Sequence, residues 1–127
     1  MKILFYAAAE DPEGPRLREL LTQGIPRANL ESYSLLAAMA LRLQKTRGDR
    51  FLVVVIARDR SHLREIVSWR AAFDGIDLLL VLPDQEEETM RSAHRLHPRY
   101  VAHKSGAYAD LLAVIRRKLS PESPPRP

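Results

Sequence analysis

Four charged residues stand just beyond the predicted strands of this chain, and their types suit metal binding. Glu10 and Asp11 follow the first apolar run, Asp59 follows the central run, and Lys104 follows the last. Because the carboxyl ends of parallel strands meet at one edge of a sheet, these side chains should surround one ligand crevice. Acids grouped there could bind Mg²⁺ through one or two carboxylates. The predicted crevice is lined by Ala8, Glu10, Asp11, Asp59, Pro83 and Lys104.

A plainer interpretation of the same residues needs no ligand, and we favour it because acidic residues are common in loops. Asp59, or Ser61 two residues later, has the position of a helix N-cap. Glu10 and Asp11 are then ordinary loop residues, and Lys104 is a solvated cation. The sequence therefore predicts no catalytic residue at this edge.

Three histidines are the other candidates for a metal site. His94 and His97 are three residues apart on a predicted helix, and His103 follows soon after. Two imidazoles at this spacing can share a metal if a third ligand converges. With Met90 and Ala93, however, His94 and His97 form the stripe that we expect to face the sheet. We therefore predict partly buried histidines and no metal.

Several kinds of catalytic site are excluded by composition or by missing motifs. The 127 residues include no cysteine, which excludes disulfides, thiol nucleophiles and cysteine metal ligands. The five glycines are isolated, so there is no glycine-rich phosphate loop. No Gly-x-Ser-x-Gly nucleophile elbow occurs, and no acid–base pair can be assembled. We expect no cofactor and no enzymatic activity.

The elements that position these residues are organised around residues 51–57. Seven apolar residues follow one another there without alternation, which predicts a strand that is buried on both faces. Further strands are predicted at 2–6, 28–32, 78–82 and 100–102, with helical stretches between them. Such alternation implies right-handed crossovers. The predicted fold class is α/β, a flavodoxin-like, doubly wound, five-stranded parallel sheet of order 2-1-3-4-5 in three αβα layers.

The chain divides into one domain and a short tail. Residues 1–119 are enough to bury a core without disulfides. Residues 120–127 hold four of the nine prolines, and we expect this tail to be disordered. Trp69 lies within the third helical stretch, whose predicted inner stripe is Leu63, Ile66, Val67 and Phe73, and is equally consistent with core packing and with a recognition anchor.

This layout resembles the receiver domain of bacterial two-component response regulators over residues 1–119. In receivers the first strand ends in an acidic pair that holds magnesium, and Ala7 and Ala8 stand at that place here. The third strand of receivers ends in the aspartate that is phosphorylated, whereas this strand ends in Val55, Ile56 and Ala57. Asp59 lies beyond it.

The later receiver motifs are also incomplete. Pro83 follows the fourth strand, where receivers carry a Ser or Thr. Lys104 stands seven residues before Leu111, which is the spacing of the receiver lysine to its last helix, but Ser105 replaces the customary proline. Tyr100 lies one residue too far upstream for the usual aromatic position. The chain therefore resembles a degenerate, or pseudo-, receiver.

The resemblance implies a non-catalytic, phosphorylation-independent module that serves signalling or regulation by binding protein partners. Receivers commonly dimerise through the fifth strand and the last helices. The corresponding residues here are basic or aromatic, and the acidic segment 84–88 could pair with them across a two-fold axis in a homodimer. This predicted interaction surface comprises Arg95, Arg99, Tyr100, Arg116 and Arg117. The alternative is a small-molecule or nucleotide-binding protein that uses the crevice.

Charge and hydropathy limit the classes of partner that we expect this chain to bind. The net charge of +4 comes from sixteen Arg and four Lys that are interleaved with acids, which argues against nucleic-acid binding. No apolar run approaches the roughly 20 residues that span a bilayer. The start of the chain imitates a very short signal peptide, but its cleavage would remove a strand. We therefore expect a cytoplasmic protein without a membrane partner.

Overall fold

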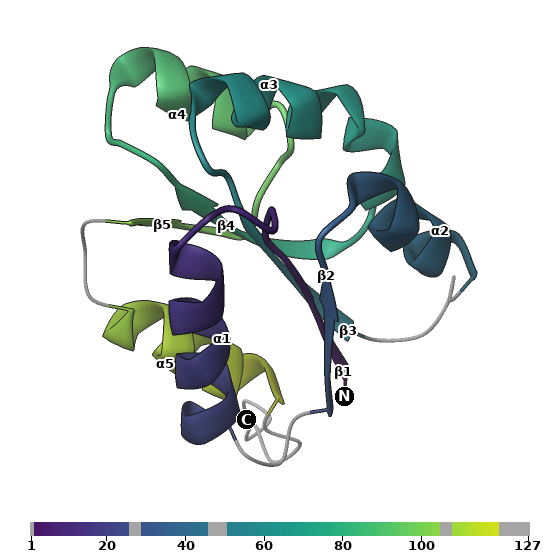
Figure 1. Cartoon of the computed structure of the whole chain (residues 1–127), viewed down its shortest axis with the longest axis vertical. Helices are drawn as coiled ribbons and strands as arrows, with labels where there is room; N and C mark the ends of the chain where they lie inside the picture. Colours follow the sequence, from purple (N-terminus) through teal and green to yellow (C-terminus); the bar gives the residue numbers. More distant parts are fainter. Residues whose placement is uncertain (1, 26–28, 46–50, 105–107, 120–127) are drawn as a thin grey trace, which may run out of the picture.

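The computed structural model describes residues 2–25, 29–45, 51–104 and 108–119, and these form a parallel sheet with helices on both faces (Figure 1). The predicted tail at 120–127 lies outside the described residues. The elements are, in chain order, β1 (Lys2–Tyr6), α1 (Glu13–Gly24), β2 (Asn29–Tyr33), α2 (Leu36–Lys45), β3 (Phe51–Ile56), α3 (Arg60–Ser68), the 3₁₀ helix η1 (Arg70–Phe73), β4 (Asp77–Leu82), α4 (Glu87–His94), β5 (Tyr100–His103) and α5 (Ala109–Leu119).

The sheet has the predicted strand order, β2-β1-β3-β4-β5, and every pair is parallel. Its register aligns the carboxyl ends of the inner strands: Tyr6 pairs with Val55, Ile56 pairs with Val81, and Leu82 pairs with His103. The loops after β1, β3, β4 and β5 therefore leave the sheet at one edge, which is where the sequence placed the crevice.

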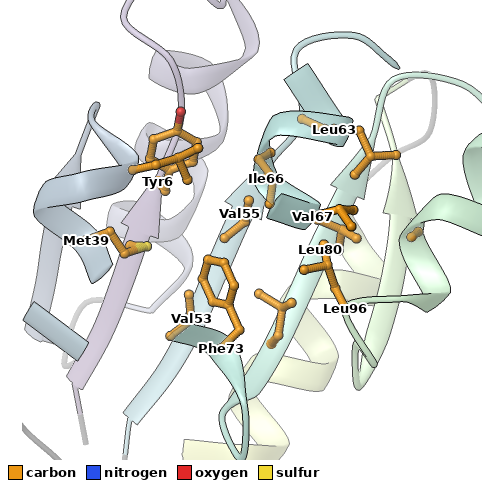
Figure 2. Packing of buried hydrophobic residues seen from close by; sticks show 14 of the residues in the cluster. Tyr6, Met39, Val53, Val55, Leu63, Ile66, Val67, Phe73, Leu80 and Leu96 are labelled. Carbon is orange, nitrogen blue, oxygen red and sulfur yellow. The ribbon is translucent and has the colours of Figure 1, made fainter. Parts of the chain in front are cut away.

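The strand β3 is buried on both faces, as its unbroken apolar run predicts. Val53 and Val55 lie in the core cluster under α2, α3 and α4, part of which Figure 2 shows. Val54 and Ile56 lie in the second cluster, under α1 and α5. Because side chains alternate between the faces of a strand, only a strand covered on both sides can bury each of its residues.

The polar strand β2 is held at the sheet edge by Glu31. Its carboxylate accepts hydrogen bonds from the Lys2 ammonium on β1 at 2.7 Å, from Arg42 Nε on α2 at 2.8 Å and from the Tyr33 hydroxyl at 2.8 Å. The hydrogen bonds from Arg42 and Lys2 lower the pKa of Glu31 to about 2. The weak strand pattern of this segment is thus explained by ionic contacts that replace apolar packing.

The prediction that His94 and His97 face the sheet is wrong. The buried residues of this region are Thr89, Ala93 and Leu96, with Met90 partly buried, whereas His94 and His97 are exposed. Successive helical residues are about 100° apart, so His94 points away from the face that Ala93 presents. The helix ends at His94, and His97 adopts a left-handed backbone with φ 51°.

Trp69 at the end of α3 is partly buried and packs against the core cluster under α3. This contact is the packing that one of the two interpretations predicts. In the described part of the chain, no helix is long and apolar enough to cross a membrane.

Candidate functional site

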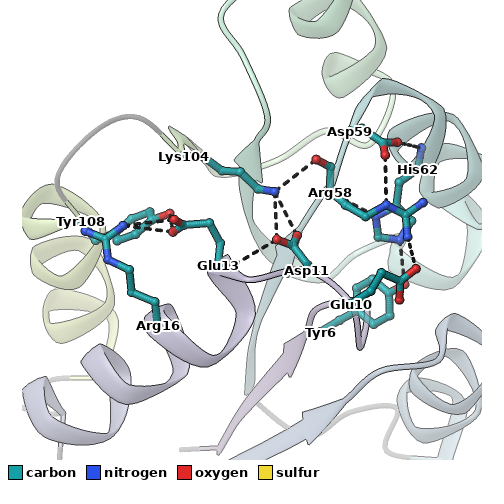
Figure 3. Close-up of polar contacts among 10 residues, drawn as sticks. All are labelled: Tyr6, Glu10, Asp11, Glu13, Arg16, Arg58, Asp59, His62, Lys104 and Tyr108. Atoms are coloured by element: carbon teal, nitrogen blue, oxygen red, sulfur yellow. Dashed lines mark hydrogen bonds and ion pairs between the residues drawn. The ribbon is translucent and has the colours of Figure 1, made fainter.

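A buried ion pair joins the loop after β1 to the end of β5. The Lys104 ammonium donates to both carboxylate oxygens of Asp11, at 3.0 Å each, and to the Arg58 carbonyl oxygen at 3.1 Å (Figure 3). The Asp11 side chain is 0% exposed and that of Lys104 is 18% exposed. Asp11 also accepts from the Glu13 backbone N–H at 3.0 Å. The expectation of a solvated lysine and an ordinary loop acid is therefore wrong.

Arg58, which follows β3, neutralises the other two acids of the edge. Its guanidinium contacts Glu10 through Nη1 at 2.5 Å and Asp59 through Nε at 3.0 Å. Ala8 and Pro83, the remaining predicted crevice residues, are half-buried at the ends of β1 and β4. The structure thus gathers all six predicted residues at one edge, and each of the charged ones has a partner within the chain.

Asp59 is the N-cap of α3, as the plainer interpretation predicts. Its carboxylate accepts from the His62 backbone N–H at 2.8 Å, which satisfies one of the free donors of the first helical turn. That hydrogen bond, followed by the contact with Arg58, lowers the pKa of Asp59. A carboxylate held in this way stays ionised and has two fixed contacts.

His62 is a buried residue of this edge that the sequence did not single out. Its Nδ1 accepts from the Arg58 backbone N–H at 2.9 Å, so in the neutral ring the proton lies on Nε2, which donates to the Tyr6 hydroxyl at 2.8 Å. His62 is 3% exposed. Burial lowers the pKa of His62, and the neighbouring Arg58 charge lowers it further. Burial and the Glu65 charge also raise the pKa of Tyr6 to about 12. The pair is therefore neutral at physiological pH.

The free energy of unfolding should depend on pH because the folded state keeps the His62 imidazole neutral. Unfolded His62 takes up a proton near its ordinary pKa of about 6.5, whereas the folded state resists protonation. The contribution of His62 is therefore complete above that pKa and is lost as the pH falls below it. We expect the free energy of unfolding, measured with urea, to fall between about pH 7 and pH 5, and His62→Gln to flatten that slope.

Exposed His94 provides the matched control, since His94→Gln should leave the slope unchanged. The carboxylate of Asp59 loses its contribution only below its own ordinary pKa of about 4, outside this window. Equal slopes in the wild type and His62→Gln would contradict the assignment.

The start of α1 is fixed to the start of α5. The Tyr108 hydroxyl donates to Glu13 Oε1 at 2.7 Å, and Arg16 contacts the same carboxylate at 3.1 Å. Burial, together with the hydrogen bond to Glu13, raises the pKa of Tyr108. The loop that carries Asp11 is thus held between the end of β1 and a clamped helix terminus.

Two alanines stand where the resemblance to receivers would place acids. Ala7 packs in the core under α1 and α5, and Ala57 is fully buried in the core of the other face. A Cβ on Gly14 would lie 2.9 Å from the Cβ of Ala7, so glycine at 14 lets α1 approach the end of β1. Within the described ranges, no group of three or more His, Asp or Glu side chains is placed to hold a metal ion.

The residues of the predicted interaction surface do not form one patch of free side chains. Arg116 donates through Nη2 to the Gly24 carbonyl at 3.1 Å, on the α1 side of the sheet. Tyr100 packs partly buried against the core under α5. Arg95 and Arg99 lie together after α4, and Arg117 is exposed on α5. His103, the third histidine considered for a metal site, contacts the Asp84 carbonyl oxygen through its Nδ1 at 3.1 Å.

Comparisons with known proteins identify the fold. No protein-family model and no curated protein matches the chain. A solved structure described as a response regulator CheY-like protein from Mesorhizobium loti is similar, with a TM-score of 0.63 and 16% sequence identity over 91% of this chain and 95% of that chain. At this identity the likeness concerns the fold alone. The chain thus has the CheY-like, flavodoxin-like α/β fold that its sequence predicts.

Proposed function

We propose that this chain is a receiver-like signalling or regulatory module that acts by binding protein partners, without phosphorylation and without catalysis. A receiver-like fold suggests a signalling domain. The observation that carries the finer proposal is the state of Lys104, whose ammonium already has three acceptors within the chain. An ammonium has three N–H donors. None is left over for a phosphoryl group.

The acids of the edge support the same proposal. Asp11 accepts three hydrogen bonds, two from Lys104 and one from the Glu13 N–H, while Glu10 and Asp59 share the Arg58 guanidinium. Mg²⁺ requires near-octahedral oxygen ligands and gives up its waters reluctantly. Binding it here would require breaking ion pairs, one of them buried, and would leave Lys104 or Arg58 without its partner.

The experiment is a thermal melt of the protein with Mg²⁺, with ATP and with both, at matched ionic strength. A ligand that binds the folded state raises the melting temperature by mass action, by about 2.7 kcal/mol of stability at 100 times its Kd. We expect no shift at millimolar concentrations beyond that given by NaCl and by sodium sulfate. A specific rise with Mg²⁺ would refute the proposal, and one with ATP alone would favour the small-ligand alternative.

A further inference from the structure

A groove of about 950 Å³ opens at the other edge of the sheet, away from Asp11 and Lys104. One wall is η1 and the turn into β4, with Arg70, Ala71 and the run from Phe73 to Asp77 in its lining. The other wall is the end of α4 and the connection to β5, from His94 to Arg99. Neither the fold nor the carboxyl-edge site gives this groove a role.

Arginines outnumber acidic residues in the lining of the groove. Its lining includes Arg70, Arg95 and Arg99 against Asp74 and Asp77. Arg99 contacts Asp77 at 3.0 Å, and the same carboxylate is 3.6 Å from the ammonium of Lys118, so Asp77 is already balanced.

The side chains of two of the arginines make little or no polar contact with the described residues. The Arg95 guanidinium has no hydrogen bond or ion pair with any of them, and the Arg70 guanidinium makes only a 3.4 Å hydrogen bond to the Val67 carbonyl. Unlike Arg58 and Arg60, which face several acids each, these two are available to an external anion.

The floor of the groove is apolar. Phe73 and Leu96, both buried, line it together with half-buried Ile76, which packs against the core cluster that contains the other two. Exposed His97 lines the rim, and its left-handed backbone, which a residue other than glycine adopts at some energetic cost, sets the path of this wall. An occupant should therefore combine negative charge with an apolar side chain.

The arrangement of the cations favours a peptide over a phosphate. Phosphate sites use convergent N–H donors, typically at a helix N-terminus, but α4 ends at the groove and η1, with four residues, is too short to provide such a site. The arginines lie instead on separate segments, so they can contact several carboxylates that are spaced along a peptide. Arginine clusters recognise acidic motifs, and arginine is enriched at interfaces.

We propose that this groove, between η1 and the end of α4, binds an acidic peptide segment of a partner protein, with an apolar side chain against Ile76 and carboxylates on Arg70 and Arg95. The inference rests on the proposed function only in that the chain acts through protein partners. Its test is independent of phosphorylation, so either can fail alone.

The test is an NMR titration of the ¹⁵N-labelled full chain with a synthetic eight-residue peptide of six Asp or Glu and two Leu. A peptide with Lys in place of each acid, and inorganic phosphate, are run in parallel. We expect saturable shifts of the amides of Gly75, Leu96 and His97 with the acidic peptide alone. Arg95→Glu should weaken that binding about tenfold, since an ion pair becomes a repulsion.

Arg64→Glu is the matched control, because Arg64 is an exposed arginine on α3 outside the groove and its charge reversal changes the net charge equally. We expect it to change the affinity less than twofold. The inference is overturned if the acidic peptide does not bind, or if it shifts amides outside the groove only. It is also overturned if both variants change the affinity equally, or if phosphate causes the same shifts as the peptide. Concentration-dependent shifts at the groove without peptide would overturn it in favour of a second copy.

Discussion

Replacing Lys104 by methionine should lower the free energy of unfolding by about 3 kcal/mol, because it leaves a buried carboxylate without its cation. The Asp11 side chain is 0% exposed, so water cannot replace the lost ammonium unless the loop opens. Methionine keeps most of the apolar stem of lysine, which makes loss of the charge the main change. Chemical denaturation at neutral pH measures the effect.

Lys118→Met is the control for this prediction. Lys118 also contacts an aspartate, Asp77, but that side chain is 33% exposed and the distance is 3.6 Å. Surface pairs of this kind contribute about 0–1 kcal/mol. In an Asp11→Asn background, Lys104→Met should also be less harmful, since the buried charge is already gone. If Lys104→Met lowers the free energy of unfolding no more than Lys118→Met does, the ion pair of Asp11 and Lys104 does not stabilise the fold.

The sequence predicts the architecture well because the relevant signals are local. An apolar run without alternation identifies β3, and the spacing of Leu63, Ile66 and Val67 identifies the buried face of α3. Asp59 as an N-cap follows from its place just before that stripe. Each of these features depends on residues within a few positions of one another.

The site was harder to predict, because its contacts join distant segments. Asp11 and Lys104 are 93 residues apart, and Tyr6 and His62 are 56 apart. The topology could place these residues at one edge, but the choice between solvated loop acids and a buried pair depends on the path of a loop. One signal was present for His62, since it stands next to Leu63 and four residues before Ile66 on the buried stripe.

We expect this chain not to accept a phosphoryl group from a small phosphodonor, and the expected effect on the rate is large. A receiver-type aspartate becomes a nucleophile only when a metal ion neutralises the incoming phosphoryl oxygens and a lysine stabilises the product. Here the strand-end positions are Ala7 and Ala57, and Lys104 is bound to Asp11. Loss of one preorganised electrostatic partner typically slows a reaction by about a hundred- to a thousandfold.

Asp59 is the candidate acceptor that stands after β3, and its carboxylate is fixed by Arg58 and by the helix that it caps. Phosphoryl transfer to Asp59 would convert its carboxylate into an acyl phosphate, with the charge on the phosphoryl oxygens, so both contacts would lose the carboxylate charge. Several stabilising electrostatic contacts would therefore be missing at once. We expect phosphoryl transfer from a small phosphodonor to be too slow to detect in an ordinary assay.

The test is intact-mass spectrometry of the protein after incubation with acetyl phosphate and Mg²⁺. A conventional receiver is treated in parallel to show that the donor is active, and Asp59→Asn shows whether any added mass depends on Asp59. We expect an unchanged mass for the wild type and for the variant. Near-stoichiometric addition of one phosphoryl group that Asp59→Asn abolishes would contradict it, since the paired acids and Lys104 would then have rearranged into a working receiver site.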